Sequence, residues 1–357
     1  MTAGRKAIIA FFLNKFRLIQ LEPGKHNYKT YLLLIFILAS HAIQIYYGGM
    51  LVAKSDKFLT MAKGVKSIIV NFQVGKIIAG LREDDIDYLL RDTEKFWNSE
   101  STEKMYKLAL RGAQAFQNLI YAAYAVIVII PIAMGSLPFD LYIPEFPGAF
   151  WLLAALQCLQ FLYAMVIVIA VDCLFLCLSL FVLAQFQLLN KRLERLGKNS
   201  NIMYEEAKIC VTRHDFLMQY TERYAGMFRY ALLSQYCITT LSVCVEMFVF
   251  TKQNVVGMAV SCFYLIALLF QLALYCFPAD MVIQEALYSS QAIINSKWYE
   301  HPRFAKIFVQ HIIRRSHKII VFSAAGLVNI NRVAFTMIFK WSVSFYALMR
   351  DMAKIID

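Results

Sequence analysis

The chain has 357 residues, of which 60% are hydrophobic and 17% are charged, and its formal net charge is +12. Soluble domains carry about 45–50% apolar and about 25% charged residues, so this composition excludes a soluble enzyme, a disordered chain and a disulfide-rich secreted module. Uncharged stretches near or above the roughly 18–20 residues that span a bilayer core recur along the chain. The sequence therefore predicts an all-α, polytopic membrane protein.

Seven membrane-spanning helices are expected in chain order. They run over about Tyr31–Met50, Phe58–Ile78, Ala113–Gly135, Trp151–Gln185, Tyr230–Phe250, Val255–Phe277 and Ile319–Met349. The second and seventh are amphipathic, as expected of helices that face other protein or a water-filled path. The fourth is long enough to project beyond the bilayer.

Positive charge is distributed unevenly among the connecting segments. Residues 1–29, 77–111, 187–229 and 278–318 together carry 26 of the 36 Lys and Arg residues. Because cytoplasmic loops are enriched in Lys and Arg, we predict a cytoplasmic N-terminus and an extracellular C-terminus, the reverse of a G-protein-coupled receptor. This bias accounts for the net charge without a nucleic-acid partner.

The same long segments contain amphipathic stretches, which predict cytoplasmic helical extensions that form a platform, or else solvated extensions without a partner.

Motifs that carry chemistry are missing from the sequence. It contains no HExxH, GxSxG, phosphate-loop or EF-hand pattern. No CxxC pair occurs among its eight cysteines, so we expect buried thiols and no metal ligands. The sequence therefore favours a protein that is not an enzyme and has no cofactor.

Two carboxylates lie inside apolar spans, where ionisable residues are costly and often functional. For Asp172 we favour a structural pairing with a basic residue over a role in a proton relay. Glu246 lies toward the external half of the fifth span, near a ligand cavity or at the aqueous rim beside Lys252.

The seventh span carries a polar stripe at helical spacing. Asn329, Arg332, Thr336, Lys340 and Ser344 share one helix face. Leu348 continues this line as an apolar residue, and a polar path that ends in an apolar ring is typical of a pore gated by dewetting. The alternative is a helix whose two bases snorkel to the interface or form internal salt bridges.

Aromatic and thioether side chains gather in the predicted external halves of spans two to six. Apolar pockets with few polar anchors suit small hydrophobic ligands, although such side chains also serve as ordinary packing. The candidate ligand-binding residues are Phe72, Tyr124, Met134, Phe161, Met165, Phe248 and Tyr264.

Several segments resemble the insect odorant receptor family. The residues that carry the resemblance are Gly326, Asn331, Phe335, Ile338, Lys340, Ser344, Phe345, Tyr346 and Leu348, then Trp298-Tyr299-Glu300 with Ile307–Arg315, the loop Leu137–Pro147, and Asp172-Cys173-Leu174-Phe175. The layout resembles the family over the whole chain, and the last sixty or so residues match it most specifically.

The resemblance implies a ligand-gated, non-selective cation channel that assembles as a heterotetramer with a co-receptor subunit. It would bind small volatile odorants in the plasma membrane of sensory neurons and touch membrane lipid. In that family the seventh helices line the pore and cytoplasmic helices form an anchor. Carried onto this sequence, the gate would include Leu348 with Val343, Ser344 and Phe345 beside it, and the subunit anchor would include Trp298 and Tyr299.

Three regions follow from these expectations. Residues 1–279 would form transmembrane helices 1–6 with an odorant-binding bundle in the outer half, residues 280–317 the cytoplasmic anchor segment, and residues 318–357 the pore-lining seventh helix. The chain lacks the co-receptor's long intracellular insertion and has Arg350 at the outer mouth. Both departures favour a ligand-tuning subunit. A gustatory receptor channel is the near alternative, and a secondary transporter is a more distant one because broken helices at mid-membrane are missing.

Overall fold

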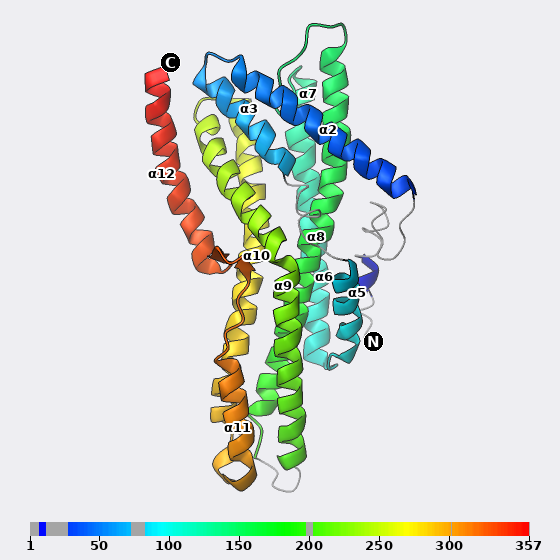
Figure 1. Ribbon diagram of the computed structural model, residues 1–357, viewed down its shortest axis with the longest axis vertical. Helices are drawn as coiled ribbons and strands as arrows, with labels where there is room; N and C mark the ends of the chain where they lie inside the picture. The colour runs from blue at the N-terminus through cyan, green and yellow to red at the C-terminus, as the bar shows by residue number, and fades with distance from the viewer. Residues whose placement is uncertain (1–6, 12–27, 73–82, 198–202, 301, 357) are drawn as a thin grey trace.

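The computed structural model describes residues 7–11, 28–72, 83–197, 203–300 and 302–356. These residues are almost entirely helical (Figure 1). The helices are α2 (Tyr28–Ala53), α3 (Phe58–Asn71), α5 (Glu83–Asp92), η2 (Thr93–Lys95), α6 (Glu100–Tyr124), the π-helix η3 (Ala125–Ile129), α7 (Ile130–Ala133), α8 (Ala149–Leu193), α9 (Met203–Phe250), α10 (Val255–Ile294), η5 (Trp298–Glu300), α11 (Pro302–Ser316) and α12 (Arg332–Ile356). Strands β1 (Ser323–Ala324) and β2 (Val328–Asn329) pair antiparallel before α12.

Short polar side chains begin several of these helices by capping free backbone N–H groups. Ser99 and Thr102 form a capping box at the start of α6. The Asn254 side chain accepts a hydrogen bond from Gly257 N at the start of α10, and Asn331 accepts one from Ala334 N at the start of α12. The apolar stretches that follow these caps are therefore helical from defined residues onward.

Five of the described helical segments are long and apolar enough to cross a membrane. They are Ile35–Ala53, Glu100–Ala133, Ala149–Leu193, Tyr204–Phe250 and Val255–Glu300. They coincide with the first, third, fourth, fifth and sixth predicted spans, whereas α3 and α12 occupy the places of the second and seventh. The chain is thus a helical, multi-pass membrane protein, as the composition predicted.

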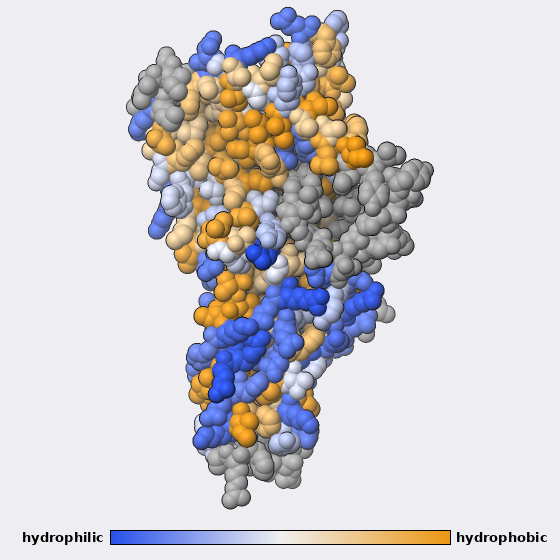
Figure 2. Space-filling view, viewed as in Figure 1, coloured by the Kyte–Doolittle hydropathy of each residue, from blue (hydrophilic) through white to orange (hydrophobic). Residues whose placement is uncertain are grey.

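The three longest helices exceed the thickness of a bilayer. At 1.5 Å per residue, the 45 residues of α8 extend over about 68 Å, more than twice the hydrocarbon core of about 30 Å. Figure 2 shows apolar side chains gathered over the upper half and hydrophilic ones over much of the lower half, where α11 and the lower ends of α9 and α10 lie (Figure 1). The lower half therefore has the surface of a solvated helical extension.

The main hydrophobic core surrounds the middle of α8. Every residue from Ile167 to Ser179 is buried, which agrees with a sequence that is apolar on all faces of the helix. Phe175 packs against the rings of Tyr224, Tyr275 and Phe322, so that α9, α10 and the segment before α12 meet at this point. This junction fixes the helices on which the site is built.

The helix at the seventh predicted span begins later than the sequence suggested. We expected it from Ile319, whereas α12 starts at Arg332 and a short hairpin precedes it. Ala325 and Gly326 have positive φ values of 50° and 85°, which turn the chain between the strands. Ile330 N donates to Phe322 O at 2.7 Å and closes the hairpin. Apolar content alone did not reveal this turn.

Candidate functional site

A cavity of about 130 Å³ lies among α2, α3, α6, η3, α8 and α10. Its wall is mainly apolar and aromatic. Side chains that form this wall include Ile120, Tyr124, Val128, Phe161, Met165 and Leu268. A mainly apolar cavity with a few polar groups is the usual form of a small-molecule site.

A π-helical turn shapes the α6 side of the cavity. Pro131 has no backbone N–H and its ring crowds the carbonyl four residues earlier, so it disturbs the regular hydrogen-bond pattern of the helix there. The chain adopts the π-helix Ala125–Ile129 at this point, as often happens near functional sites. Ile127 and Val128 of this turn face the cavity, and Tyr124 Oη donates to Cys158 O of α8 at 3.4 Å.

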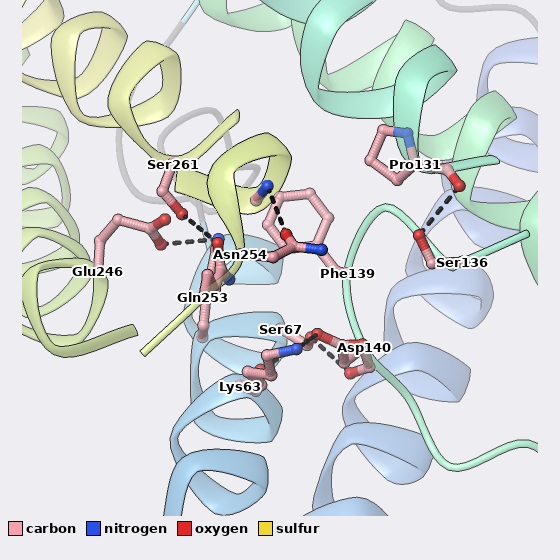
Figure 3. Close-up of polar contacts among 12 residues, drawn as sticks. Lys63, Ser67, Pro131, Ser136, Phe139, Asp140, Glu246, Gln253, Asn254 and Ser261 are labelled. Atoms are coloured by element: carbon pink, nitrogen blue, oxygen red, sulfur yellow. Dashed lines mark hydrogen bonds and ion pairs between the residues drawn. The ribbon is translucent and has the colours of Figure 1, made fainter. Parts of the chain in front are cut away.

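The loop between α7 and α8 covers the cavity with Phe139. The Phe139 ring stacks on Phe161 with centroids 4.7 Å apart, and Gln157 Nε2 donates to Phe139 O at 2.9 Å. The next residue anchors the loop to α3: Asp140 forms an ion pair with Lys63 at 3.2 Å, and Ser67 Oγ donates to Asp140 O at 2.7 Å (Figure 3). The loop is thus held on both sides of the aromatic ring that it contributes.

One end of the cavity is polar. His41 of α2, Asn71 of α3 and Gln160 of α8 meet there, and all three line the cavity. Glycines bring α2 and α3 close together: a Cβ atom at Gly64 would lie 2.8 Å from the side chain of Val52 and 3.1 Å from Gly48 O. Small residues at a helix–helix contact allow such an approach inside a membrane.

A buried ion pair lies behind the aromatic wall. Lys66 Nζ of α3 is 2.7 Å from Glu246 Oε2 of α9, with the two side chains 14% and 0% exposed. The ammonium group lies 4.8 Å from the centroid of the Tyr264 ring and 5.5 Å from that of Phe139, both of which line the cavity. Glu246 lies near the connection from α9 to α10, beside Gln253 and Ser261 (Figure 3). It is therefore buried and paired, and it is not at an aqueous rim.

The second intramembrane acid lies in the core. Asp172 is fully buried and accepts hydrogen bonds from Gln271 Nε2 at 2.5 Å and from Tyr275 Oη, both on α10. These two partners are neutral groups. Since Gln271 also lines the cavity, its hydrogen bond connects this buried acid to the cavity wall.

The structure brings together four of the seven predicted ligand-binding residues. Tyr124, Phe161, Met165 and Tyr264 all line the cavity. Phe72 and Met134 are instead 56% and 57% exposed. Phe248 is 1% exposed and packs edge-to-face on Phe58 in a separate cluster.

The sequence did not predict most of the other cavity residues, among them His41, Asn71, Phe139 and Gln160. The sequence does contain a signal for the three polar residues, namely that each lies inside an apolar span. Amide and imidazole side chains are costly there unless they have partners. The sequence contains no such signal for Phe139, since this residue follows the third span in a connecting loop.

The predicted gate residues lie on the uncovered face of α12. Val343, Ser344, Phe345 and Leu348 are all exposed in the single chain, Leu348 by 56%. The opposite face, with Ala334, Ile338 and Ser342, is buried. Cys244 Sγ of α9 donates to Ser342 Oγ at 3.8 Å, so α9 supports the helix from behind.

The two bases of the predicted polar stripe have different surroundings. Arg332 Nε lies 2.9 Å from Asp280 Oδ2 of α10, which is an internal salt bridge, and Lys340 is exposed. Asn329 belongs to β2 and not to the helix. Of the predicted anchor residues, Trp298 and Tyr299 form the short helix η5 with Glu300, and Tyr299 is 61% exposed.

Comparison with known proteins shows which protein family this chain is similar to. A family model described as 7tm Odorant receptor matches residues 48–343. Odorant receptor 22c of Drosophila melanogaster is 24% identical over 233 residues, which cover 59% of this chain and 56% of that protein. Odorant receptor Or2 of Anopheles gambiae is 23% identical over 185 residues, 48% of each chain. The chain spans about half the length of these curated relatives.

Solved structures share the fold over nearly the full length. The insect olfactory receptor OR5 from Machilis hrabei, in complex with eugenol, superposes with a TM-score of 0.82 at 12% identity over 98% of both chains. The same receptor without that ligand gives a TM-score of 0.81 over 97% of this chain. With the family model matching most of its residues, the chain belongs to the odorant receptor family, a family of receptors and not of enzymes.

Proposed function

We propose that the chain is an odorant-binding subunit of a heteromeric, ligand-gated cation channel in the plasma membrane of sensory neurons, and that it conducts together with a co-receptor subunit. The observation that carries the proposal is the 130 Å³ apolar cavity in the apolar half of the molecule. It has the size and lining for a small volatile compound, because an engineered cavity of about 150 Å³ binds benzene.

The connection from the cavity to α12 supports a gating role. Tyr264 and Phe139 form part of the cavity wall, and the Lys66–Glu246 pair behind them joins α3 to α9. Cys244, two residues before Glu246, contacts Ser342 of α12. A ligand that fits the open arrangement of this wall better than the closed one shifts the equilibrium toward the open state.

The exposed face of α12 supports a pore role in an oligomer. Its apolar members include Val333, Met337, Val343 and Leu348, each between 46% and 58% exposed in the single chain. Helices of neighbouring subunits that face one another across an axis would cover this face, and Leu348 would then form the apolar ring that closes the path by dewetting.

The arrangement of the ends supports the proposed orientation. The C-terminus lies at the end of the molecule opposite the hydrophilic lower half (Figures 1 and 2). Since the lower half contains α11, with its basic last turn, and segments rich in Lys and Arg next to the start of α9, we assign it to the cytoplasm. The seven-span topology with a cytoplasmic N-terminus and an extracellular C-terminus is part of the proposal, as are the anchor role of residues 280–317 and the pore role of residues 318–357.

Whole-cell current tests the proposal. The chain is expressed alone and with an odorant co-receptor, and both are tested against a panel of small volatiles. Odorant-evoked cation current only in the presence of the co-receptor is the expected result. Silence in both conditions, with the complex shown at the cell surface, would contradict it.

A further inference from the structure

The polar end of the cavity is built from three buried side chains on three helices. His41, Asn71 and Gln160 are 8%, 7% and 5% exposed. His41 Nδ1 and Gln160 Nε2 each lie 2.7 Å from Asn71 Oδ1. The rest of the wall is mainly apolar, and its other polar groups are the Tyr124 and Tyr264 hydroxyls and the Gln271 amide, so these three residues are the largest polar cluster in the described part of the cavity.

A backbone carbonyl orients the Asn71 amide at the centre of this cluster. Asn71 Nδ2 donates to Ser67 O at 2.5 Å, and this turns Asn71 Oδ1 toward the other two side chains. An amide oxygen only accepts hydrogen bonds, so we assign the proton of the neutral His41 ring to Nδ1 and place the NH₂ group of Gln160 on the side that faces Asn71. His41 Nδ1 and Gln160 Nε2 both approach Asn71 Oδ1, and the two nitrogen atoms are therefore also in contact with each other. Turning either amide would place two acceptor oxygens in contact, which excludes the alternative assignment.

Two acceptors remain after this assignment. His41 Nε2 and Gln160 Oε1 are buried and have no hydrogen-bond partner among the residues that the structure describes. Buried polar atoms in folded proteins nearly always have partners, and an unsatisfied one is costly. Protonation of the ring is disfavoured because it would place an unpaired charge in an apolar site. A ligand that binds to this cluster must therefore supply a hydrogen-bond donor, and a further acceptor would find no partner there.

We propose that this end of the cavity selects odorants that carry a hydroxyl group, namely small alcohols and phenols, by accepting the hydroxyl proton at His41 Nε2 or Gln160 Oε1. The inference rests on the proposed odorant-binding function. An aldehyde, ketone or ester of the same size has only acceptor oxygens and would face two further acceptors at this end of the cavity, so a donor to it would have to come from elsewhere in the wall, such as the Tyr264 hydroxyl. A cavity of about 130 Å³ limits the apolar part to about one aromatic ring.

Benzyl alcohol and benzaldehyde form a suitable probe pair because they share a carbon skeleton and differ in whether the oxygen donates. Their affinities are measured by competition on the purified full-length chain in detergent, and their half-maximal concentrations by evoked current with the co-receptor. One net hydrogen bond corresponds to a factor of about ten. We expect the alcohol to bind about tenfold more tightly than the aldehyde.

Two substitutions test the named acceptors. His41→Phe and Gln160→Met each remove one acceptor while keeping a side chain of similar size, and the alcohol preference should fall to about threefold or less in at least one of them. Met165→Leu is the matched control, because Met165 lies on the same helix as Gln160 and lines the same cavity, and it should keep the tenfold preference. Ethylbenzene, which has no oxygen, reports whether each variant still folds and binds.

The outcomes separate this inference from the function on which it rests. Equal affinities for alcohol and aldehyde in the unaltered chain, with evoked current for both, would overturn the hydroxyl selectivity and leave the odorant-binding role intact. A preference that survives both substitutions would overturn the assignment to His41 and Gln160. Failure of all three compounds to bind would contradict the cavity's role in odorant binding and the inference with it.

Discussion

The Lys66–Glu246 pair provides the strictest test of the site's energetics. At an effective dielectric constant of about 20, two unit charges 2.7 Å apart attract each other by about 6 kcal/mol. Much of this attraction offsets the cost of removing both groups from water. Loss of one partner leaves the other charge unpaired in an apolar site, which costs about 3–5 kcal/mol. Glu246→Gln and Lys66→Met should each destabilise the chain by about this amount.

The double variant distinguishes an ion pair from ordinary packing. With both charges removed, no unpaired charge remains, so we expect Lys66→Met/Glu246→Gln to lie within about 1–2 kcal/mol of the unaltered chain. The two costs would then be strongly non-additive, with a coupling energy of about 3 kcal/mol or more. Equilibrium unfolding of the detergent-solubilised chain gives the four free energies of unfolding.

An exposed pair of equal length is the control. Lys104 Nζ lies 2.7 Å from Glu100 Oε1, but the two side chains are 75% and 84% exposed. The same cycle on this pair should give a coupling energy below about 1 kcal/mol, because water screens the charges and the side chains lose entropy on pairing. Additive costs at Lys66 and Glu246, or equal coupling in both pairs, would refute the reasoning from burial.

The remaining predictions concern the pore and the membrane orientation. Leu348→Ser should raise the current in the absence of odorant, because a polar ring at the constriction stays wet; an unchanged leak in complexes that reach the surface would remove Leu348 from the gate. Epitope tags at the two ends of the chain, probed on intact and permeabilised cells, should show an intracellular N-terminus and an extracellular C-terminus, and the reverse pattern would contradict the assignment made from positive charge.

The helical fold could be predicted from the sequence because length and hydropathy decide which segments cross a bilayer. The predicted spans from Ala113–Gly135 to Val255–Phe277 lie within the observed helices and turns at those positions. The family resemblance drawn from the closing residues is confirmed by the family match over residues 48–343. The start of α12 at Arg332 was missed, because the hairpin depends on the backbone conformation of Ala325 and Gly326 and not on apolar content.

The candidate site was only partly predictable. Neighbouring residues on a helix differ by about 100° in direction, so an error of one residue in helix rotation moves a side chain from the cavity to another face. Phe161 and Met165 face the cavity, for instance, whereas Phe248 faces a different cluster.

The polar end of the cavity was hidden for a different reason. Asn71 is 30 residues from His41 and 89 from Gln160 in sequence. Their meeting depends on how α2, α3 and α8 pack together, and no local pattern in the sequence carries that information.

The central claim, that an odorant acts from this cavity, is tested most directly by two matched substitutions. Met165 lines the cavity, and Met134 is 57% exposed outside it. Dose–response curves of odorant-evoked current are recorded for Met165→Trp and Met134→Trp, each with the co-receptor and each checked for surface expression. The account predicts that Met165→Trp shifts or abolishes the response while Met134→Trp matches the unaltered chain. Equal responses in both variants would contradict it.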